Sequence, residues 1–227
     1  FTKRDIAIAM IKKKHPNNAS IARFIREARI TASLNHPNII SVYDIGFDNN
    51  NLPYFTMNYV EGRSLSKILK ALNANVERFH KHFDLNVLLR IFLKVCSAVK
   101  YAHSNNILHL DLKPSNILID NTGNAILCDW GMAKDISGSQ ASPSDSTVCV
   151  QNDQHETAKT IKISVVKNNT QKIMVVEEQT GKGRIKGTPG YMAPEQASAR
   201  LKQKGKRTDI YSLGAILYSI LTYKPSV

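Results

Sequence analysis

The N-terminal part of the chain alternates short apolar runs with one amphipathic stretch. Residues 6–11 are apolar, are as short as a strand and precede a lysine-rich break with Pro16. Between residues 20 and 34 the apolar side chains recur at steps of three and four positions, which predicts a helix. Residues 39–46 and 54–59 then resemble two strands joined by a polar turn. The pattern predicts the order strand, helix, strand, strand.

After residue 62 the pattern becomes mainly helical. Apolar periodicity predicts helices at residues 64–72, 85–104 and 209–222, and two short apolar runs predict a hairpin of residues 117–119 and 125–127. The last helix is apolar nearly all round, so we expect it to be buried. The change of pattern predicts two lobes joined near residues 58–62.

Residues 135–184 differ from the rest because they are rich in Ser, Thr, Asn and Gln. Such a composition is typical of a solvated, low-complexity insertion. Within it, residues 160–166 and 172–176 alternate well enough to predict a hairpin around Asn168 and Asn169. We therefore expect the insertion to be partly ordered.

Composition excludes several classes of protein. Among the 227 residues, 42% are hydrophobic, which suits a buried core, and the three cysteines form no C-x-x-C pair, which favours a reducing, cytoplasmic location. No apolar run reaches the roughly 18 residues that span a bilayer, so we expect no membrane segment. The net charge of +13 could attract nucleic acid, but the basic residues are scattered and lack interleaved aromatic residues. A solvated surface is favoured over a specific nucleic-acid partner.

Three short motifs carry candidate chemistry, and their order is informative. They are HLDLKPSN at residues 109–116, DWG at residues 129–131 and GTPGYMAPE at residues 187–195. In these motifs the chain resembles the eukaryotic-type protein kinases, and the phrases LNHPNII and GTPGYMAPEQ are similar to bacterial members. The resemblance covers nearly the whole chain apart from the insertion. It implies an α+β, bilobal kinase fold, with a small β-rich N-lobe in residues 1–60 and a mainly α-helical C-lobe in residues 61–227.

The resemblance also implies a reaction, the transfer of the ATP γ-phosphate to Ser or Thr hydroxyls of a protein substrate. Asp111 would accept the proton of the substrate hydroxyl, and Lys113 would supply a cation beside the transferred phosphate. Asn116 and Asp129 would bind Mg²⁺, because this hard cation prefers oxygen ligands. Lys113 together with Thr188 is typical of Ser/Thr-specific members of the family.

Further positions follow from the resemblance. Around the nucleotide it implies Ala7 on the first strand, Glu27 on the first helix, Met57 as gatekeeper, and Tyr59 and Val60 as the backbone that contacts the base. A core methionine at a strand end is an equally good interpretation of Met57. In the last helix, Asp209 looks like an N-terminal cap, and in the family the same carboxylate also braces the catalytic loop.

The chain departs from the family at several positions. Aligning residues 6–8 with the family's V-A-I-K strand puts Ala9 where the phosphate-binding lysine should stand, opposite Glu27. Lys12 offers a competing alignment that needs a shifted strand, and Ala9 is favoured. Leu110 replaces the arginine before the catalytic aspartate. The charge of that arginine normally needs a phosphate on the activation segment to neutralise it, so activity here should not depend on phosphorylation that acts through this arginine. Trp130 replaces a phenylalanine and keeps an aromatic plug.

Two functions from different classes remain. The first is an ATP-dependent protein Ser/Thr kinase, favoured by the intact Asp111, Asn116 and Asp129. The second is a pseudokinase or truncated kinase-like module that binds nucleotide or a partner, favoured by Ala9 and by the absence of a Gly-rich loop before residue 6. We expect the chain to hold an incomplete catalytic domain, either a fragment of a longer gene product or a degraded copy.

Overall fold

The computed structural model describes residues 5–11, 16–137, 161–168, 171–178, 189–197 and 204–225, with the backbone alone for 161–168 and 171–178. Its strands are β1 (Ile6–Met10), β2 (Val42–Phe47), β3 (Pro53–Asn58), β4 (Gly62–Ser64), β5 (Ile107–Leu108), β6 (Ile117–Asp120), β7 (Ala125–Leu127), β8 (Lys134–Asp135), β9 (Ile161–Asn168) and β10 (Gln171–Glu178). Its helices are α1 (Asn18–Ser33), α2 (Leu65–Asn73), α3 (Glu77–His82), α4 (Leu85–Ser104), α5 (Pro194–Ala197) and α6 (Lys206–Thr222), with 3₁₀ turns η1 (Pro114–Asn116) and η3 (Pro189–Tyr191).

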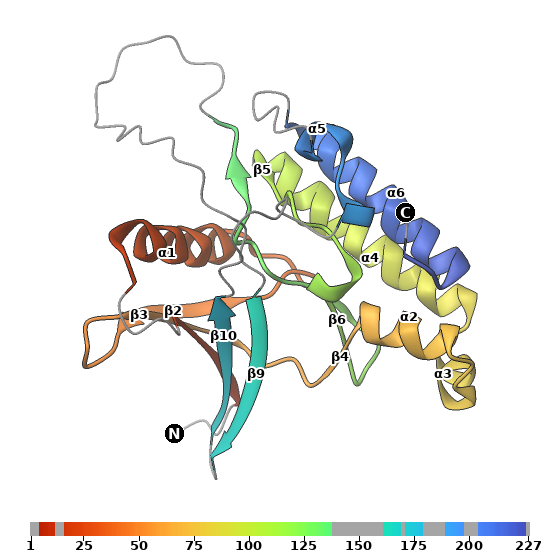
Figure 1. Ribbon diagram of the computed structural model, residues 1–227, viewed down its shortest axis with the longest axis horizontal. Coiled ribbons are helices and arrows are strands. Elements are labelled where there is room, and N and C mark those ends of the chain that lie inside the picture. The colour runs from red at the N-terminus through yellow and green to blue at the C-terminus, as the bar shows by residue number, and fades with distance from the viewer. Residues whose placement is uncertain are drawn as a thin grey trace.

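The small lobe is a three-stranded antiparallel sheet in the order β1-β3-β2, with α1 against it (Figure 1). Alternate residues of β1 and β3 are buried, and Ala9 pairs with Phe55 across the two strands. The Phe55 ring lies 5.0 Å from the ring of Phe24 on α1, so the buried face of the sheet is the face that α1 covers. The Asn17 side chain caps α1 by accepting the N–H of Ser20 at 2.9 Å. The predicted strand, helix, strand, strand order is confirmed.

The start of β2 differs from the prediction, because the residues before it bind the other lobe. Ile40 N–H donates to the Leu127 carbonyl at 3.0 Å, and Leu127 N–H donates to the Asn38 carbonyl at 2.8 Å. The Asn38 side chain also donates to the Ala125 carbonyl at 2.8 Å. The apolar run therefore serves as a hydrogen-bonded link between lobes before it becomes a strand at Val42.

The large lobe is built on two helices, α4 and α6, which lie side by side (Figure 1). Helix α4 has the predicted bounds, and the Asp84 side chain caps it by accepting the N–H of Val87 at 2.8 Å. Helix α6 begins earlier than predicted, at Lys206. It is buried along one face only, since Ile210 and Leu221 are 56% and 57% exposed. The predicted burial is therefore confirmed for one face of the helix and wrong for the other.

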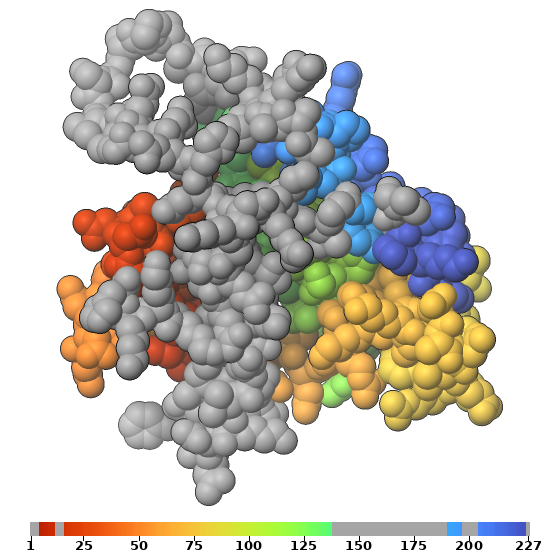
Figure 2. Space-filling model, in the orientation of Figure 1, coloured from red at the N-terminus to blue at the C-terminus, as the bar shows by residue number. Residues whose placement is uncertain are grey.

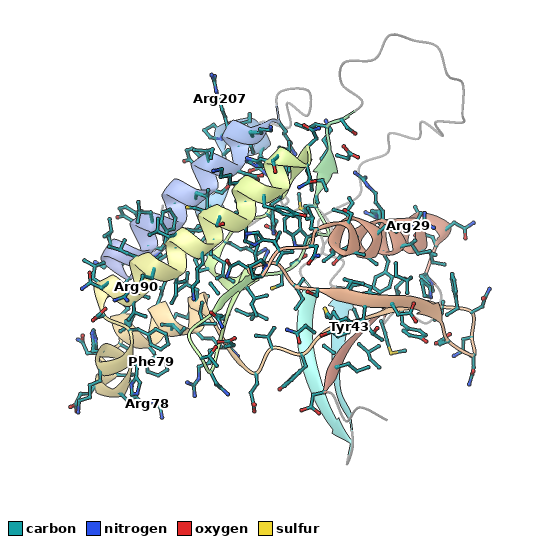
Figure 3. All side chains as sticks on the ribbon, turned by 180° about the vertical axis from the view of Figure 1, so that it is seen from behind. Arg29, Tyr43, Arg78, Phe79, Arg90 and Arg207 are labelled. Atoms are coloured by element: carbon teal, nitrogen blue, oxygen red, sulfur yellow. The ribbon has the colours of Figure 1, made fainter. Side chains whose placement is uncertain are left out.

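Several short elements escaped the sequence pattern. Strand β4 pairs with β6, and β5 pairs with β8, each over two or three residues. Helix α3 is held by Phe79. The guanidinium group of Arg78 lies 5.4 Å from the centre of the Phe79 ring (Figure 3), and that of Arg63 lies 5.5 Å from it. Elements this short carry too few residues for a period to emerge.

The hairpin predicted inside the insertion is confirmed by its backbone. Strands β9 and β10 pair antiparallel, with Asn168 opposite Gln171, and β10 lies against β1. Asn169 and most of the rest of 135–184 lie outside the described residues.

The α+β fold class is confirmed by a small β-rich lobe and a mainly helical large lobe. In Figure 2 the red residues of the small lobe and the yellow and blue residues of the large lobe lie on opposite sides of the molecule. The division at residue 60 stays a prediction. Among the described helices, none is long and apolar enough to cross a membrane, and the cytoplasmic location also stays a prediction.

Candidate active site

The loop after β5 is held by one buried carboxylate from a helix far along the chain. Asp209 of α6 is fully buried and accepts the backbone N–H groups of His109 at 2.9 Å and Leu110 at 2.8 Å. Because a carboxylate can only accept, His103 Nε2 donates to Asp209 Oδ2 at 2.8 Å. The expected bracing of the loop by Asp209 is thus confirmed, whereas its expected role as helix cap was wrong, because α6 begins three positions earlier, at Lys206.

Leu110 has a backbone conformation that its neighbours must enforce. Its φ is 62°, in the left-handed region that a residue with a Cβ rarely adopts. Besides its N–H bond to Asp209, its carbonyl accepts the side chain of Gln196 at 2.8 Å, and its own side chain is buried. The leucine that replaces the family's arginine therefore belongs to the core and offers no charge to a phosphate.

Three predicted site residues meet directly after this loop. Lys113 Nζ lies 2.7 Å from Asp111 Oδ2, and both side chains are only 13% exposed. The Asn116 side-chain amide donates to the Asp111 backbone carbonyl at 2.9 Å and to Asp111 Oδ2 at 3.1 Å. The 3₁₀ turn η1, which begins at Pro114, brings Asn116 back over Asp111. Asp111 is thereby fixed by two donors, and Asn116 Oδ1 lies 3.5 Å from the Ser115 hydroxyl.

His109 packs behind the same aspartate as a neutral ring. Its Nδ1 accepts the N–H of Asp111 at 3.2 Å, so Nε2 carries the proton and donates to the Cys128 carbonyl at 3.4 Å. Burial lowers the pKa of His109, which favours this neutral form. The ring centre lies 4.6 Å from that of Trp130, which is 1% exposed. Within the described part of the chain, Trp130 Nε1 has no hydrogen-bond acceptor.

Asp129 faces these residues from the turn after β7. Its φ is 66°, and it accepts the N–H of Gly131 in a long contact of 3.5 Å. Burial, and then the charge of Asp111, raise the pKa of Asp129 to about 6, although the charge of Lys113 and the N–H of Gly131 lower it. Asp111, Asn116 and Asp129 are therefore brought to one place, as the motif order predicted. Over the residues described, no group of three or more His, Cys, Asp or Glu side chains forms a metal cage.

Glu27 of α1 reaches the same place from the small lobe. A Cβ built on Gly131 would lie 3.0 Å from Glu27 Oε2 and 3.4 Å from Asp129 Oδ1, so the two carboxylates flank one small volume. Burial, and then the charge of Asp129, raise the pKa of Glu27 to about 8. Ala9, the residue aligned with the family's lysine, lies on the sheet face that α1 covers and brings no charge there. Lys12 lies outside the described residues.

The residues predicted to contact the nucleotide lie on β1, on β3 and on the segment after β3. Ala7 pairs with Met57 across β1 and β3, and both side chains are buried. Tyr59 and Val60 are partly buried at the joint between the lobes, where they pack against the core. Thr188 lies outside the described residues.

Sequence reasoning missed two supporting residues, His103 and Gln196. His103 is buried and binds Asp209, which stands 106 positions later, and Gln196 binds Leu110, which stands 86 positions earlier. Neither residue type stands out locally. The only signal available was the placement of His103 on the buried face of α4, together with the resemblance that gave Asp209 its role.

Comparison with known proteins defines the class to which this fold and site belong. The protein kinase domain family matches residues 2–227, and the chain therefore belongs to that family. It is 37% identical over 230 residues to the serine/threonine-protein kinase PknD of Protochlamydia amoebophila, an alignment that covers 97% of this chain and 21% of that protein. It is 35% identical over 223 residues to PknD of Chlamydia muridarum, covering 96% of this chain and 22% of that protein.

The similarity to bacterial Ser/Thr kinases predicted from the motifs is thus confirmed. The chain spans about a fifth of the length of the curated relatives it matches.

Proposed function

We propose that this chain carries the catalytic residues of an ATP-dependent protein serine/threonine kinase. The observation that carries the proposal is the cluster of Asp111, Lys113 and Asn116. Asp111 Oδ2 lies 2.7 Å from Lys113 Nζ and 3.1 Å from Asn116 Nδ2, and the charge of Asp111 acts on the nearby Asp129. The family uses ATP and Mg²⁺ and acts on proteins. Similarity to relatives named serine/threonine-protein kinase supports Ser and Thr hydroxyls as acceptors.

The residues present fit a magnesium nucleotide. The Asp129 carboxylate and the Asn116 amide oxygen are hard oxygen donors, and Mg²⁺ usually keeps several waters, so it does not need a cage of protein ligands. Mg²⁺ would neutralise charge on the phosphates. Met57, Tyr59 and Val60 would hold the base at the joint between the lobes.

In the proposed reaction Asp111 orients the substrate hydroxyl and accepts its proton as the hydroxyl oxygen bonds to the γ-phosphorus and the bond to ADP breaks. Lys113, held 2.7 Å from Asp111, places a positive charge beside the phosphoryl oxygens. The buried network of Asp209, His103 and the loop N–H groups keeps Asp111 in position.

The second candidate is a pseudokinase that binds nucleotide or a partner without transfer. The observation that favours it is Glu27, whose carboxylate faces Asp129 instead of a lysine at position 9. Removal of one cation from a phosphate clamp costs about 3 kcal/mol of transition-state stabilisation. The kinase remains the better-supported function because Asp111, Asn116 and Asp129 are all present.

Phosphoryl transfer from radiolabelled ATP, with Mg²⁺, to a mixed set of Ser- and Thr-containing proteins separates the two candidates. We expect label in protein Ser or Thr, and loss of at least about a hundredfold in rate for Asp111→Asn, because a positioned general base is removed. Asp84→Asn is the matched control. It makes the same chemical change at a helix cap where Asn works equally well, and it should keep full activity.

Mg-ATP binding measured alongside identifies the alternative. Nucleotide binding without any transfer would establish the pseudokinase, and transfer that survives Asp111→Asn would overturn the assignment of the base.

A further inference from the structure

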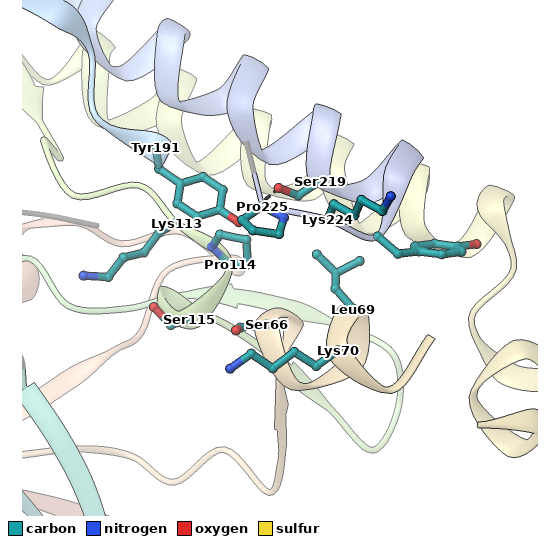
Figure 4. A pocket seen from close by; sticks show the side chains of 11 residues that line it. Ser66, Leu69, Lys70, Lys113, Pro114, Ser115, Tyr191, Ser219, Lys224 and Pro225 are labelled. Carbon is teal, nitrogen blue, oxygen red and sulfur yellow. Dashed lines mark hydrogen bonds between the residues drawn. The ribbon is translucent and has the colours of Figure 1, made fainter. Parts of the chain in front are cut away.

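A pocket of about 240 Å³ opens beside the catalytic loop, next to Lys113, Pro114 and Ser115 (Figure 4). Four parts of the large lobe form it: the first turns of α2, the loop at η1, the turn η3, and the end of α6 with the residues after it. The residues that line it are Ser66, Leu69, Lys70, Lys113, Pro114, Ser115, Tyr191, Ser219, Tyr223, Lys224 and Pro225. Its size suits a single side chain of a bound peptide.

The lining of this pocket is cationic and rich in hydroxyls. It includes Lys70, Lys113 and Lys224, and none of the residues that line it is acidic. Ser66 and Lys70 stand one turn apart on α2, so both project from the same face of that helix. Lys70 and Lys224 are exposed, which leaves their ammonium groups able to swing toward a ligand. A pocket of this composition attracts an anionic group and repels a cationic one.

The side chains of Tyr191 and Leu69 form two walls that give the pocket a fixed shape. The Tyr191 hydroxyl lies 3.0 Å from Ser219 Oγ, which ties η3 to α6, and Figure 4 shows this bond at the back of the pocket. Ser219 Oγ in turn donates to the Ala215 carbonyl at 3.1 Å. Leu69 is buried and closes the side toward the core. The walls are therefore held by the core, while the lysines supply the charge.

Lys113 connects this pocket to the reacting atoms. It lines the pocket and also lies 2.7 Å from Asp111, the proposed base. A peptide whose hydroxyl reaches Asp111 therefore has a neighbouring side chain within reach of the pocket. Since Lys113 is engaged by Asp111, Lys70 and Lys224 are the charges left to select that side chain.

We propose that this pocket is a substrate-specificity subsite that takes an acidic side chain, a carboxylate or a phosphorylated Ser or Thr, close to the acceptor hydroxyl. The proposal rests on the proposed kinase function and names its substrate class as acidic or already phosphorylated protein segments. Lys70 and Lys224 are its specificity-determining residues, and Ser66 and Ser115 are additional donors for the anion.

A peptide series tests the proposal by rate. Each peptide carries one Ser acceptor, and Glu, phosphoserine, Gln or Lys is placed in turn at each nearby position on either side. We expect kcat/KM to be at least about fivefold higher for Glu or phosphoserine than for Gln at one position, and lowest for Lys. Comparison of Glu with phosphoserine at that position decides whether carboxylate or phosphate is the preferred anion.

Variants assign any preference to the pocket. Lys70→Gln with Lys224→Gln should remove the preference while leaving kcat/KM for the Gln peptide unchanged. Lys67→Gln is the matched control, because Lys67 is exposed on α2 and does not line the pocket. A preference that survives the double variant, or that the Lys67 change removes equally, would indicate general attraction by a basic protein and overturn the proposal.

Binding separates this inference from the kinase function itself. Peptides with Ala in place of the acceptor Ser cannot be phosphorylated, and their affinity is measured by fluorescence anisotropy. If no transfer occurs but the Glu peptide binds more tightly through Lys70 and Lys224, the subsite stands and the kinase function fails. If transfer occurs and neither rate nor affinity favours an acidic side chain, the subsite alone is wrong. Absence of both preference and transfer overturns both.

Discussion

The two lobes of this protein differ in how the charge of a buried acidic side chain is compensated. In the large lobe, Asp209 is fully buried but has three donors, two loop N–H groups and His103. Glu27 of the small lobe instead lies beside Asp129, a second acid, and the pKa values of both are raised. A buried carboxylate with donors fixes a structure, whereas one that faces another carboxylate is a source of strain. The buried charge that supports the catalytic loop is therefore compensated, whereas Glu27 and Asp129 face each other as two acids.

The largest effect should follow from breaking the compensated side. Asp209→Ala removes the acceptor of two backbone N–H groups and leaves them buried, and we expect the free energy of unfolding to fall by about 3 kcal/mol or more. Urea unfolding followed by circular dichroism measures it. Asp48→Ala, in a turn on the surface of the small lobe, should cost clearly less. Equal losses for the two would contradict the view that Asp209 holds the loop.

Supplying the missing cation should have the next largest effect. Ala9→Lys places an ammonium on the sheet face that α1 covers, toward Glu27, and we expect kcat/KM for ATP to rise roughly tenfold to a hundredfold. Steady-state kinetics at saturating protein substrate gives the ratio. Ala9→Met, which has similar bulk without charge, and Ala22→Lys, on the exposed side of α1, are the controls. A rate unchanged by the lysine would mean that position 9 does not limit the reaction.

The strain on Glu27 should appear as a pH dependence of stability. Its pKa is raised from its ordinary 4.5 to about 8, so the folded state binds more protons, and stability falls as pH rises from 4.5 to 8. Asp129, whose pKa is raised to about 6, gives a slope of the same sign below pH 6, so Glu27→Gln should remove the slope mainly between pH 6 and 8. At pH 8 it should raise the free energy of unfolding by on the order of 1 kcal/mol. Unfolding curves across this range test it. Glu77→Gln, whose carboxylate is 81% exposed on α3, should leave the slope unchanged.

The smallest effect concerns Leu110. Because this side chain is apolar and buried, no arginine charge waits for a phosphate, and phosphatase treatment should change kcat by less than about twofold. The same treatment of a Leu110→Arg variant provides the comparison. A large loss of activity after dephosphorylation of the protein that retains Leu110 would show that phosphate acts through another residue.

Much of the fold was predictable because its signals are local. Helix α4 was predicted to the residue, since it is long, strongly periodic and capped by Asp84. Residues 39–41 were misassigned to a strand because an apolar run does not reveal whether its backbone will pair within the lobe or with Leu127. The exposed face of α6 was also missed, since apolar side chains on every face suggest burial but do not identify what covers them.

For the site, the motifs predicted which residues meet but not their mutual contacts. Asp111, Asn116 and Asp129 were named together, and the structure brings them together. Only the tertiary structure revealed the 2.7 Å contact between Lys113 and Asp111 and the hydrogen bond from Gln196 to the Leu110 carbonyl. The basic pocket was also invisible in the sequence, because Lys70, Lys113 and Lys224 come from three separate segments whose charges looked scattered.

The sequence by itself determined the family and predicted the order of the lobes and the candidate reactive side chains, and it favoured Ala9 at the position of the family's lysine. Each of these depends on residue types at short spacing, which the chain carries before it folds. Only the tertiary structure decided that Glu27 faces Asp129, that His103 and Asp209 support the catalytic loop, and that three lysines converge beside it. These contacts join residues far apart in the sequence, and their energies depend on burial and distance, which exist only once the core has packed.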